Sequence, residues 1–245
     1  MIVYVLSLVA LILPLAMSVG DLQNQLKSTV EARDICRADL MEIQNRNAAA
    51  LKTLMALNPE ALMLRKSLEY LEFALLIAPP LAKPEIEAAI RLVKLQQRIL
   101  DKAQKLIILT ADNQTKMSLW VTQTKLVTYF AQRTFKQSSW VIRNLKRIKN
   151  FPVKLAVKPD RSGTTAPLYE TQSQFTEAQK VKLEWTAESR LGPWLSRWLN
   201  FSKSEHKDFC SASLKENNNT DGANSWSQIT QTKKWTPVLT EGKYF

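Results

Sequence analysis

The chain opens with MIVYVLSLVALILPLAMSVG, residues 1–20, a stretch without a charged side chain that leads directly into Asp21. An apolar stretch of about twenty residues can cross a bilayer core of roughly 30 Å as one helix. Pro14 does not prevent this, because neighbouring helices and local adjustments of the backbone can satisfy the carbonyl that it leaves without a donor. We therefore expect an uncleaved, single-pass transmembrane anchor over residues 1–20.

Two other interpretations of this stretch stay open. Residues 16–18, Ala-Met-Ser, suit a signal peptidase, so the stretch could be a cleaved signal peptide, although no Lys or Arg precedes its apolar core. It could also be a buried core helix. Lys27, Arg33 and Arg37 are the nearest cations, and the positive-inside rule read literally would keep the following residues in the cytoplasm.

The chain has two cysteines, Cys36 and Cys210. An even number of widely separated cysteines is typical of a structural disulfide in an oxidising compartment, and two unrelated buried thiols are the alternative. We predict the disulfide, which places the bulk of the chain in the periplasm or outside the cell. The cysteines indicate export and the cations indicate a cytoplasmic location. Both signals are compatible with export if a short basic leader precedes Met1 in a precursor.

Composition argues against several kinds of enzyme. The five glycines form neither a GxGxxG pattern nor a phosphate loop, so we do not expect a nucleotide-binding fold. His206 is the only histidine and lies in a polar stretch typical of a loop, without a recognisable partner for a triad. One histidine and two distant cysteines are too few for a zinc site. We expect no catalytic, cofactor-binding or metal-binding residues.

Residues 21–150 favour helix, because the stretch lacks glycine and its prolines are confined to positions 59, 79, 80 and 84. We predict one helix over residues 2–57, continuous with the anchor, a second over about 59–77 capped by Asn58, and a much longer third that begins at residues 83–85. The short connections between them favour antiparallel packing, which makes a helical hairpin.

Apolar side chains recur with helical spacing in the first and third helices. The first stripe consists of Leu22, Leu26, Val30, Arg33, Arg37, Leu40, Ile43, Leu51, Leu54 and Leu57, and the third helix carries Ile86, Ile90, Val93, Ile99, Leu100, Leu106 and Leu109. We interpret both stripes as helix contacts within one subunit. An intermolecular coiled coil is the alternative.

Between Asp112 and Asp160 there are ten basic residues and no acidic one, interleaved with aromatic residues. This combination suits an anionic lipid surface or an acidic partner, and nucleic acid is not expected on a chain with an apolar anchor. A solvated basic face with core aromatics is the structural alternative. The cations that we expect in this basic aromatic face, residues 113–159, are Lys125, Arg133, Lys136, Arg143, Lys146, Arg147 and Lys149.

After residue 151 the sequence changes to short alternating runs. Strands are predicted at 153–157, 181–185 and, more weakly, 227–232. Five tryptophans, at positions 185, 194, 198, 226 and 235, suit a small core better than an exposed face. We expect an α+β, mainly α protein: an anchor at 1–20, a helical stalk and hairpin at 21–150, and a small, partly β C-terminal domain or β-rich extension on the helices at 151–245.

An apolar N-terminal helix that continues into a polar amphipathic helix, followed by a β-containing part tied back by a cysteine pair, resembles the plan of pilins and pseudopilins. Residues 1–25, MIVYVLSLVALILPLAMSVGDLQNQ, are also similar to the N-terminal anchors of TadE/TadG-like proteins of Tad-type pili. The likeness covers about residues 1–55. Val5 stands where major pilins carry Glu, and simple pilins lack the hairpin, so no processing residue is carried over.

The resemblance implies a bacterial inner-membrane anchor whose bulk acts through assembly with other envelope or pilus subunits, or with further copies of itself. We therefore expect a non-enzymatic, membrane-anchored structural or assembly component of a cell-envelope apparatus, pilus-like or secretion-associated. The alternative is a membrane-tethered binding module that uses the basic aromatic face on anionic lipid or an acidic partner. An enzyme centred on His206 is a third, less supported hypothesis.

Overall fold

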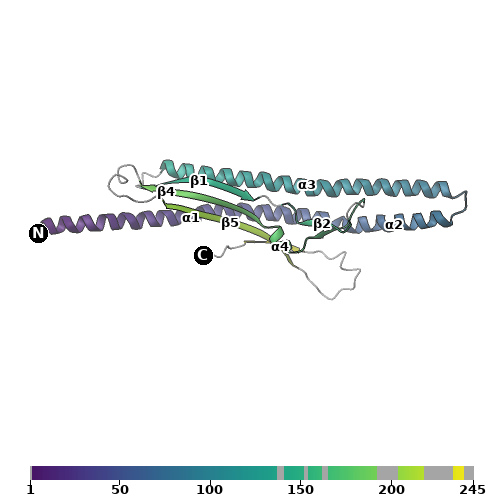
Figure 1. Ribbon diagram of the computed structural model, residues 1–245, viewed down its shortest axis with the longest axis horizontal. Helices are drawn as coiled ribbons and strands as arrows, with labels where there is room; N and C mark the ends of the chain where they lie inside the picture. Colours follow the sequence, from purple (N-terminus) through teal and green to yellow (C-terminus); the bar gives the residue numbers. More distant parts are fainter. Residues whose placement is uncertain are drawn as a thin grey trace.

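The computed structural model describes residues 2–136, 141–151, 154–161, 165–191, 204–217 and 234–239. Its fold is α+β and mostly helical, with long helices and a small sheet. The long helices are α1 (Ile2–Ala56), α2 (Asn58–Ile77) and α3 (Lys83–Lys136). Figure 1 shows α1 and α2 end to end, with α3 running back along both of them. The N-terminus and the α2–α3 connection therefore lie at opposite ends of an elongated molecule.

The junction between α1 and α2 does not reverse the chain. Leu57 keeps a helical backbone, with φ −85° and ψ −11°, and its carbonyl still accepts a bond of 3.0 Å from the Ala61 N–H. Pro59 lies in the first turn of α2, where its missing N–H costs nothing. The expected antiparallel packing of the first two helices is therefore wrong, whereas the α2–α3 hairpin is confirmed (Figure 1).

A four-stranded antiparallel sheet lies on α1 and α3 (Figure 1). Its strands, in spatial order, are β1 (Val141–Phe151), β4 (Val181–Leu191), β5 (Ser204–Asn217) and β6 (Lys234–Leu239). A smaller pair consists of β2 (Val157–Pro159) and β3 (Tyr169–Thr171), and a single short turn forms α4 (Phe175–Ala178). The strand predicted at 181–185 is confirmed, and the one at 227–232 lies outside the described residues. The β-rich part thus covers the helices along one side.

Strand β1 corrects the expectation that helix continues to residue 150. Leu145 and Ile148 are three residues apart, a spacing that suits a helix, and both pack against the core. A strand can place both inward because the register of β1 against β4 shifts between Leu145 and Arg147. An extra residue at such a bulge changes the face on which later side chains lie. The bulge therefore produces a helix-like spacing in a strand.

The strand predicted at 153–157 is also displaced. Residues 154–156 are irregular, and β2 begins at Val157. The N–H of Leu155 donates to the Asp112 carboxylate at 2.8 Å, and the N–H of Ala156 donates to the Gln179 side-chain oxygen at 2.8 Å. Side chains from elsewhere in the chain thus replace strand partners at these two positions.

The main core lies between α1, α3 and the sheet. Leu40, Leu119, Leu126, Leu183 and Trp185 are all 2% exposed or less. A second cluster joins the next part of α1 to β5 and β6 and contains Trp235. Burial of these two tryptophans agrees with a tryptophan-containing core; Trp194, Trp198 and Trp226 lie outside the described residues.

The apolar stripe of the first helix is confirmed at Leu40, Ile43, Leu51 and Leu54, which are buried, whereas Leu26 and Val30 are exposed. The stripe of the third helix is confirmed in part. Ile90 and Leu100 are buried, and Ile86 and Val93 are half-buried. Ile99, Leu106 and Leu109 are each more than half exposed, so these three assignments are wrong. The buried face of α3 also carries polar residues, namely Gln97, Gln104, Thr115 and Thr122.

Among the residues whose properties the structure describes, we find no helix with the length and apolarity needed to cross a bilayer. Most side chains of the expected anchor, residues 1–20, lie outside the described residues, and only its helical backbone is described as part of α1.

Candidate interaction surface

The sheet is attached to α1 along one seam, the α1–β5 seam. The inward-facing β5 residues Asp208, Cys210 and Ala212 follow the two-residue period of a strand. Arg33 on α1 donates to the Asp208 carboxylate at 2.8 Å, and the Gln44 amide donates to the Ala212 carbonyl at 2.9 Å. Between these two contacts lies the cysteine pair. Three kinds of interaction therefore fix β5 parallel to α1.

Cys36 and Cys210 lie at disulfide-bonding distance, with their Cα atoms 6.3 Å apart. Both side chains are buried in the main core, and 174 residues separate them in the sequence. The Cα separation is within the range of ordinary disulfides. The seam thus brings together the two residues that the sequence singled out as a disulfide.

A three-residue polar cluster joins α1 to the C-terminal part of α3. The Tyr129 hydroxyl donates to Glu31 at 2.6 Å, and Arg133 donates to the same carboxylate oxygen at 2.7 Å. The Tyr129 hydroxyl, with help from Arg133, holds the pKa of Glu31 below its usual value. Burial, followed by the bond to Glu31, raises the pKa of Tyr129 to about 12. Arg133, expected in the basic face, thus has an internal partner.

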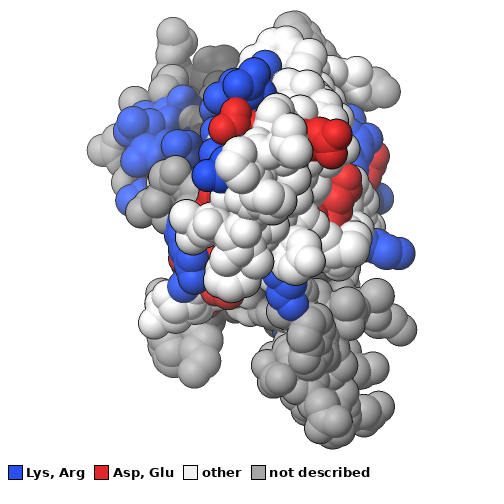
Figure 2. Space-filling model, turned by 90° about the vertical axis from the view of Figure 1, so that its right-hand side faces the viewer, with Lys and Arg blue, Asp and Glu red and all other residues white. Residues whose placement is uncertain are grey.

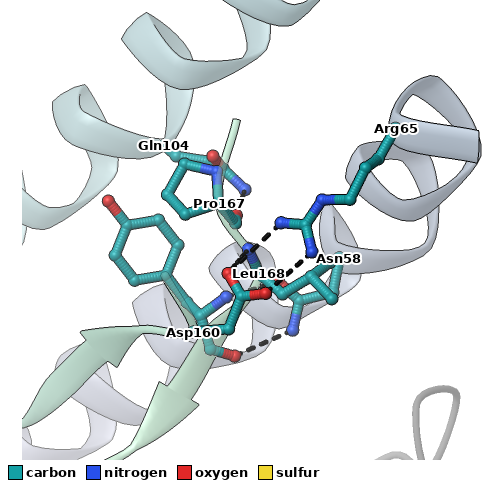
Figure 3. A network of polar contacts seen from close by, with 7 residues as sticks. Asn58, Arg65, Gln104, Asp160, Pro167 and Leu168 are labelled. Atoms are coloured by element: carbon teal, nitrogen blue, oxygen red, sulfur yellow. Dashed lines mark hydrogen bonds and ion pairs between the residues drawn. The ribbon is translucent and has the colours of Figure 1, made fainter. Parts of the chain in front are cut away.

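A second attachment, the junction clasp, holds Asp160 and residues 165–169 against the start of α2 (Figure 3). Arg65 binds Asp160 with two bonds, at 2.8 and 3.3 Å. The Asn58 amide donates to the Tyr169 carbonyl at 2.9 Å and accepts from the Tyr169 N–H at 3.0 Å. The expectation that Asn58 caps α2 is therefore wrong, because its side chain pairs with the backbone of β3.

The same clasp reaches α3 and explains one of its buried polar residues. The Gln104 amide donates to the Pro167 carbonyl at 3.1 Å (Figure 3). Ala166, with a left-handed φ of 54°, is buried against Ala61 and Leu100. Such a backbone is costly for a residue with a Cβ, and it persists where the surroundings hold it in place. The clasp therefore ties together both helices of the hairpin beside the α1–α2 junction.

Asp160 is the charged centre of the clasp. Arg65, followed by the backbone N–H of Leu168 at 2.9 Å, holds the pKa of Asp160 below its usual value. Both side chains of the ion pair are largely shielded, at 18% exposed for Arg65 and 17% for Asp160. Asp160 is thus an anion in the folded protein at neutral pH.

The seven cations of the expected basic face are divided between α3 and β1. Lys125 binds Asp39 at 2.8 Å, Arg133 binds Glu31, and Lys146 pairs with Glu205. Arg147 and Lys149 are exposed on β1. The side chains of Lys136 and Arg143 lie outside the described residues. The structure therefore does not gather these residues into one helical face.

Lys125 lies in a groove between α1 and α3, lined also by Asp39, Glu42, Arg46 and Val121, with a volume of about 370 Å³. An adjoining hollow of about 440 Å³ contains Trp120, whose side chain is 63% exposed. Tyr129 and Phe130, the aromatic residues that follow, are partly or fully buried. Of these three aromatic residues, only Trp120 belongs to an exposed surface.

Many of the exposed large apolar side chains of the described residues lie on α2 and α3. More than half of each of these side chains is exposed: Met63, Tyr70 and Phe73 on α2, and Leu92, Leu95, Ile99, Leu106 and Leu109 on α3. We name these sets the α2 outer stripe and the α3 outer stripe. Ala61 and Leu100 are buried between the helices, so the two stripes lie on opposite outer edges of the hairpin.

Charged residues accompany both outer stripes. Lys66 and Glu69 accompany the α2 outer stripe, whereas Arg91, Arg98 and Lys102 accompany the α3 outer stripe. Figure 2 views the molecule from the hairpin end and shows a broad uncharged surface bordered by charged groups. Periodicity had assigned Ile99, Leu106 and Leu109 to the core, so sequence reasoning missed this surface; the signal was the competing inward row of glutamines.

Within the described part of the chain, no three His, Cys, Asp or Glu side chains gather as metal ligands would. His206 lies on β5, and its side chain is outside the described residues. Comparisons with protein-family models, with curated proteins and with solved structures give no match. The likeness to pilins and TadE/TadG-like proteins therefore stays a prediction.

Proposed function

We propose that this chain is a non-enzymatic, membrane-anchored structural or assembly component of a cell-envelope apparatus, pilus-like or secretion-associated. The observation that carries the proposal is the continuity of α1, which runs as one helix from Ile2 in the apolar N-terminal segment to Ala56 in the folded body. A bilayer that holds residues 1–20 would therefore orient the whole rod.

Stiffness of the rod supports a structural role. The α1–β5 seam fixes the sheet to α1, and the junction clasp fixes the point where α1 passes into α2. At 1.5 Å per residue, helices α1 and α2 together span about 110 Å. A rod of this kind holds its two ends at a set separation, which is what a stalk or an assembly subunit requires.

Assembly is supported by the two outer stripes. Large contiguous apolar patches on a protein surface mark interaction sites. Glu69 beside the α2 outer stripe and the basic flank of the α3 outer stripe suit contact between neighbouring copies, or with an envelope subunit of similar design. Because the stripes are different surfaces on opposite edges, such a contact would be head-to-tail and could repeat.

Export of the bulk to the periplasm or the cell surface is supported by the cysteine pair. A buried pair at disulfide-bonding distance across 174 residues is typical of proteins that fold in an oxidising compartment. We propose this localisation on that ground. The alternative, a tether through the basic aromatic face, is less favoured because Lys125, Arg133 and Lys146 have acidic partners within the chain.

The anchor is tested by membrane extraction of the full chain. We expect it to stay in membranes during an alkaline carbonate wash. The double substitution Leu8→Arg with Leu11→Arg should release it, because each arginine at the centre of a span costs roughly 2.5–3.5 kcal/mol.

Leu26→Arg is the matched control, since Leu26 is exposed on α1 beyond the apolar segment and its replacement should leave the protein in the membrane. Release of the wild-type chain by the wash, or retention of the double variant, would contradict the anchor.

A further inference from the structure

The connection between α2 and α3 is apolar throughout. Residues 73–82 read FALLIAPPLA, without a polar or charged side chain. Leu76, Ile77 and Leu81 are 80%, 72% and 94% exposed. We name Leu76, Ile77, Pro79, Pro80 and Leu81 the hairpin tip. It lies at the end of the molecule opposite the N-terminus, and Figure 2 views the protein from this end.

We propose that the hairpin tip inserts into the apolar layer of a lipid bilayer. The tip ends the rod, so it can enter a bilayer end-on while the rest of the protein stays in water (Figure 1). Its exposed side chains come both from the last turn of α2 and from the connection. A fluid apolar phase surrounds side chains that point in several directions, whereas a partner helix covers one face.

The backbone of the tip has few unpaired N–H donors that would resist leaving water. Pro79 and Pro80 have no N–H. The Ala82 N–H donates to the Pro79 carbonyl at 3.0 Å, and the Ile86 N–H donates to the Ala82 carbonyl at 3.2 Å. Unpaired backbone donors and acceptors both oppose entry of irregular segments into hydrocarbon. Two prolines and an internal bond lower the donor part of that penalty, and the last carbonyls of α2 stay closest to water at a shallow depth of insertion.

The residues next to the tip suit the interface between lipid and water. Phe73 and Tyr70 lie one and two turns back along α2, where aromatic side chains would meet the headgroups. Lys83 follows the connection and can contact lipid phosphate. Glu72, the nearest acidic residue on α2, is paired with Lys94 at 3.4 Å. The helical rise from Phe73 to Ile77 is about 6 Å, a typical depth for an interfacial segment.

The bilayer that the tip enters is a second one. About 85 Å of helix separates residue 20 from Ile77, so a tip at the far end of the rod does not return to the membrane of the anchor. That step rests on the proposed function, because it assumes that residues 1–20 occupy the first bilayer. Insertion of the tip itself does not depend on the anchor.

The test uses the full chain reconstituted in lipid nanodiscs, where both sides of the disc are accessible. The discs are mixed with protein-free vesicles of equal parts phosphatidylcholine and phosphatidylglycerol, and the vesicles are floated in a density gradient. We expect wild-type protein to float with the vesicles. The variant Leu76→Glu with Leu81→Glu should lower the floated fraction about tenfold, because charge opposes insertion.

The matched control is Leu106→Glu with Leu109→Glu, which makes the same change at exposed leucines of the same hairpin but well away from the tip. It should float within about twofold of wild type. Equal thermal unfolding of all three proteins would show that the tip variant is folded, as expected from the exposure of both leucines. Equal flotation of the tip variant and wild type, or no flotation of wild type, would overturn the proposal.

Two further outcomes separate this proposal from others. In the first outcome, wild-type discs pair with one another in the absence of vesicles, the tip variant does not pair, and wild type does not float with vesicles. This result would assign the tip to contact with a second copy of the chain and overturn insertion. Failure of the chain to enter nanodiscs would contradict the anchor. The wild-type chain and both variants would then be mixed directly with vesicles. Flotation of the tip variant equal to that of wild type would again overturn the proposal.

Discussion

Helix α3 has a buried and an exposed face in the body and in the hairpin alike. In the body, Leu119 and Leu126 are completely buried between α1 and the sheet. In the hairpin, Leu106 and Leu109 are more than half exposed, because α2 and the segment around Ala166 cover only the opposite side of the helix. Similar leucines thus belong to a core on one face of α3 and to a surface on the other. The face decides this in both regions, because Leu100 is 6% exposed in the hairpin whereas Trp120 is 63% exposed beside the sheet.

The largest expected effect compares these two regions within the same helix. Leu119→Ala should lower the free energy of unfolding by about 2–5 kcal/mol, because it leaves a cavity in the main core. Leu109→Ala should change it by no more than about 0.5 kcal/mol, because its side chain is exposed. Urea unfolding of the full chain in mild detergent measures both. Equal losses would show that the hairpin has a cover as complete as that of the body.

The cysteine pair belongs to the body and should matter nearly as much. Replacing both Cys36 and Cys210 with Ala should cost about 2–4 kcal/mol if they form a disulfide, because the unfolded chain loses a long-range constraint. The same unfolding experiment, with and without reductant, measures it. Reductant should destabilise wild type and leave the double variant unchanged; a wild type insensitive to reductant would argue for two separate thiols.

The junction clasp lies between the two regions. Asp160→Asn should destabilise the protein by about 1–3 kcal/mol at neutral pH, because it removes a shielded, doubly bonded ion pair. The folded pKa of Asp160 is lowered, so its stabilisation is complete above the ordinary carboxyl pKa and is lost as pH falls through the lowered value.

Thermal unfolding at neutral pH and near pH 3 checks the sign for Asp160. The difference in unfolding temperature between wild type and Asp160→Asn should be large at neutral pH and small near pH 3. A gap that widens in acid would contradict a lowered pKa. Glu31→Gln in the body should also destabilise the protein more at neutral pH than in acid, since the pKa of Glu31 is also lowered.

Head-to-tail contact between hairpins can be tested by exchange of charges. Arg98→Glu should weaken self-association about tenfold, roughly 1.4 kcal/mol, because an acidic residue would then face Glu69 beside the α2 outer stripe. Adding Glu69→Arg should restore it. Analytical ultracentrifugation or crosslinking gives the measurement, and the absence of rescue would count against pairing of these two flanks.

The smallest effect is expected on β1. Arg147→Glu with Lys149→Glu should alter vesicle flotation of nanodisc-bound protein by less than about twofold, since we assign lipid contact to the hairpin tip rather than to the basic aromatic face. Loss of flotation comparable to that of the tip variant would favour the basic face instead.

Helix boundaries were largely predictable from the sequence, because proline placement is a local signal. Pro59, Pro79 and Pro84 mark the starts and stops that the structure shows. The direction of the chain at Leu57 was not predictable, because a short connection alone does not distinguish a reversal from a continuation. Likewise, the bulge in β1 gave Leu145 and Ile148 a helical spacing, and only the pairing with β4 reveals the strand.

The candidate surfaces were harder to predict than the helices. Two lone cysteines suggested their own pairing, but Gln44 and Gln104 are buried because carbonyl groups more than sixty residues away accept their hydrogen bonds. No periodicity records such partners. The apolar periodicity of α3 therefore predicted Leu106 and Leu109 in the core, which concealed the α3 outer stripe.

The measurement that tests the membrane-anchored rod most directly is the accessibility of Cys36 and Cys210 to a membrane-impermeant thiol reagent. Intact cells and spheroplasts are labelled with and without reductant, and the intact mass is recorded. We predict a bridged pair that is labelled only after reduction and from outside the inner membrane. Free thiols that are labelled only after lysis would place the body in the cytoplasm and contradict an exported envelope component.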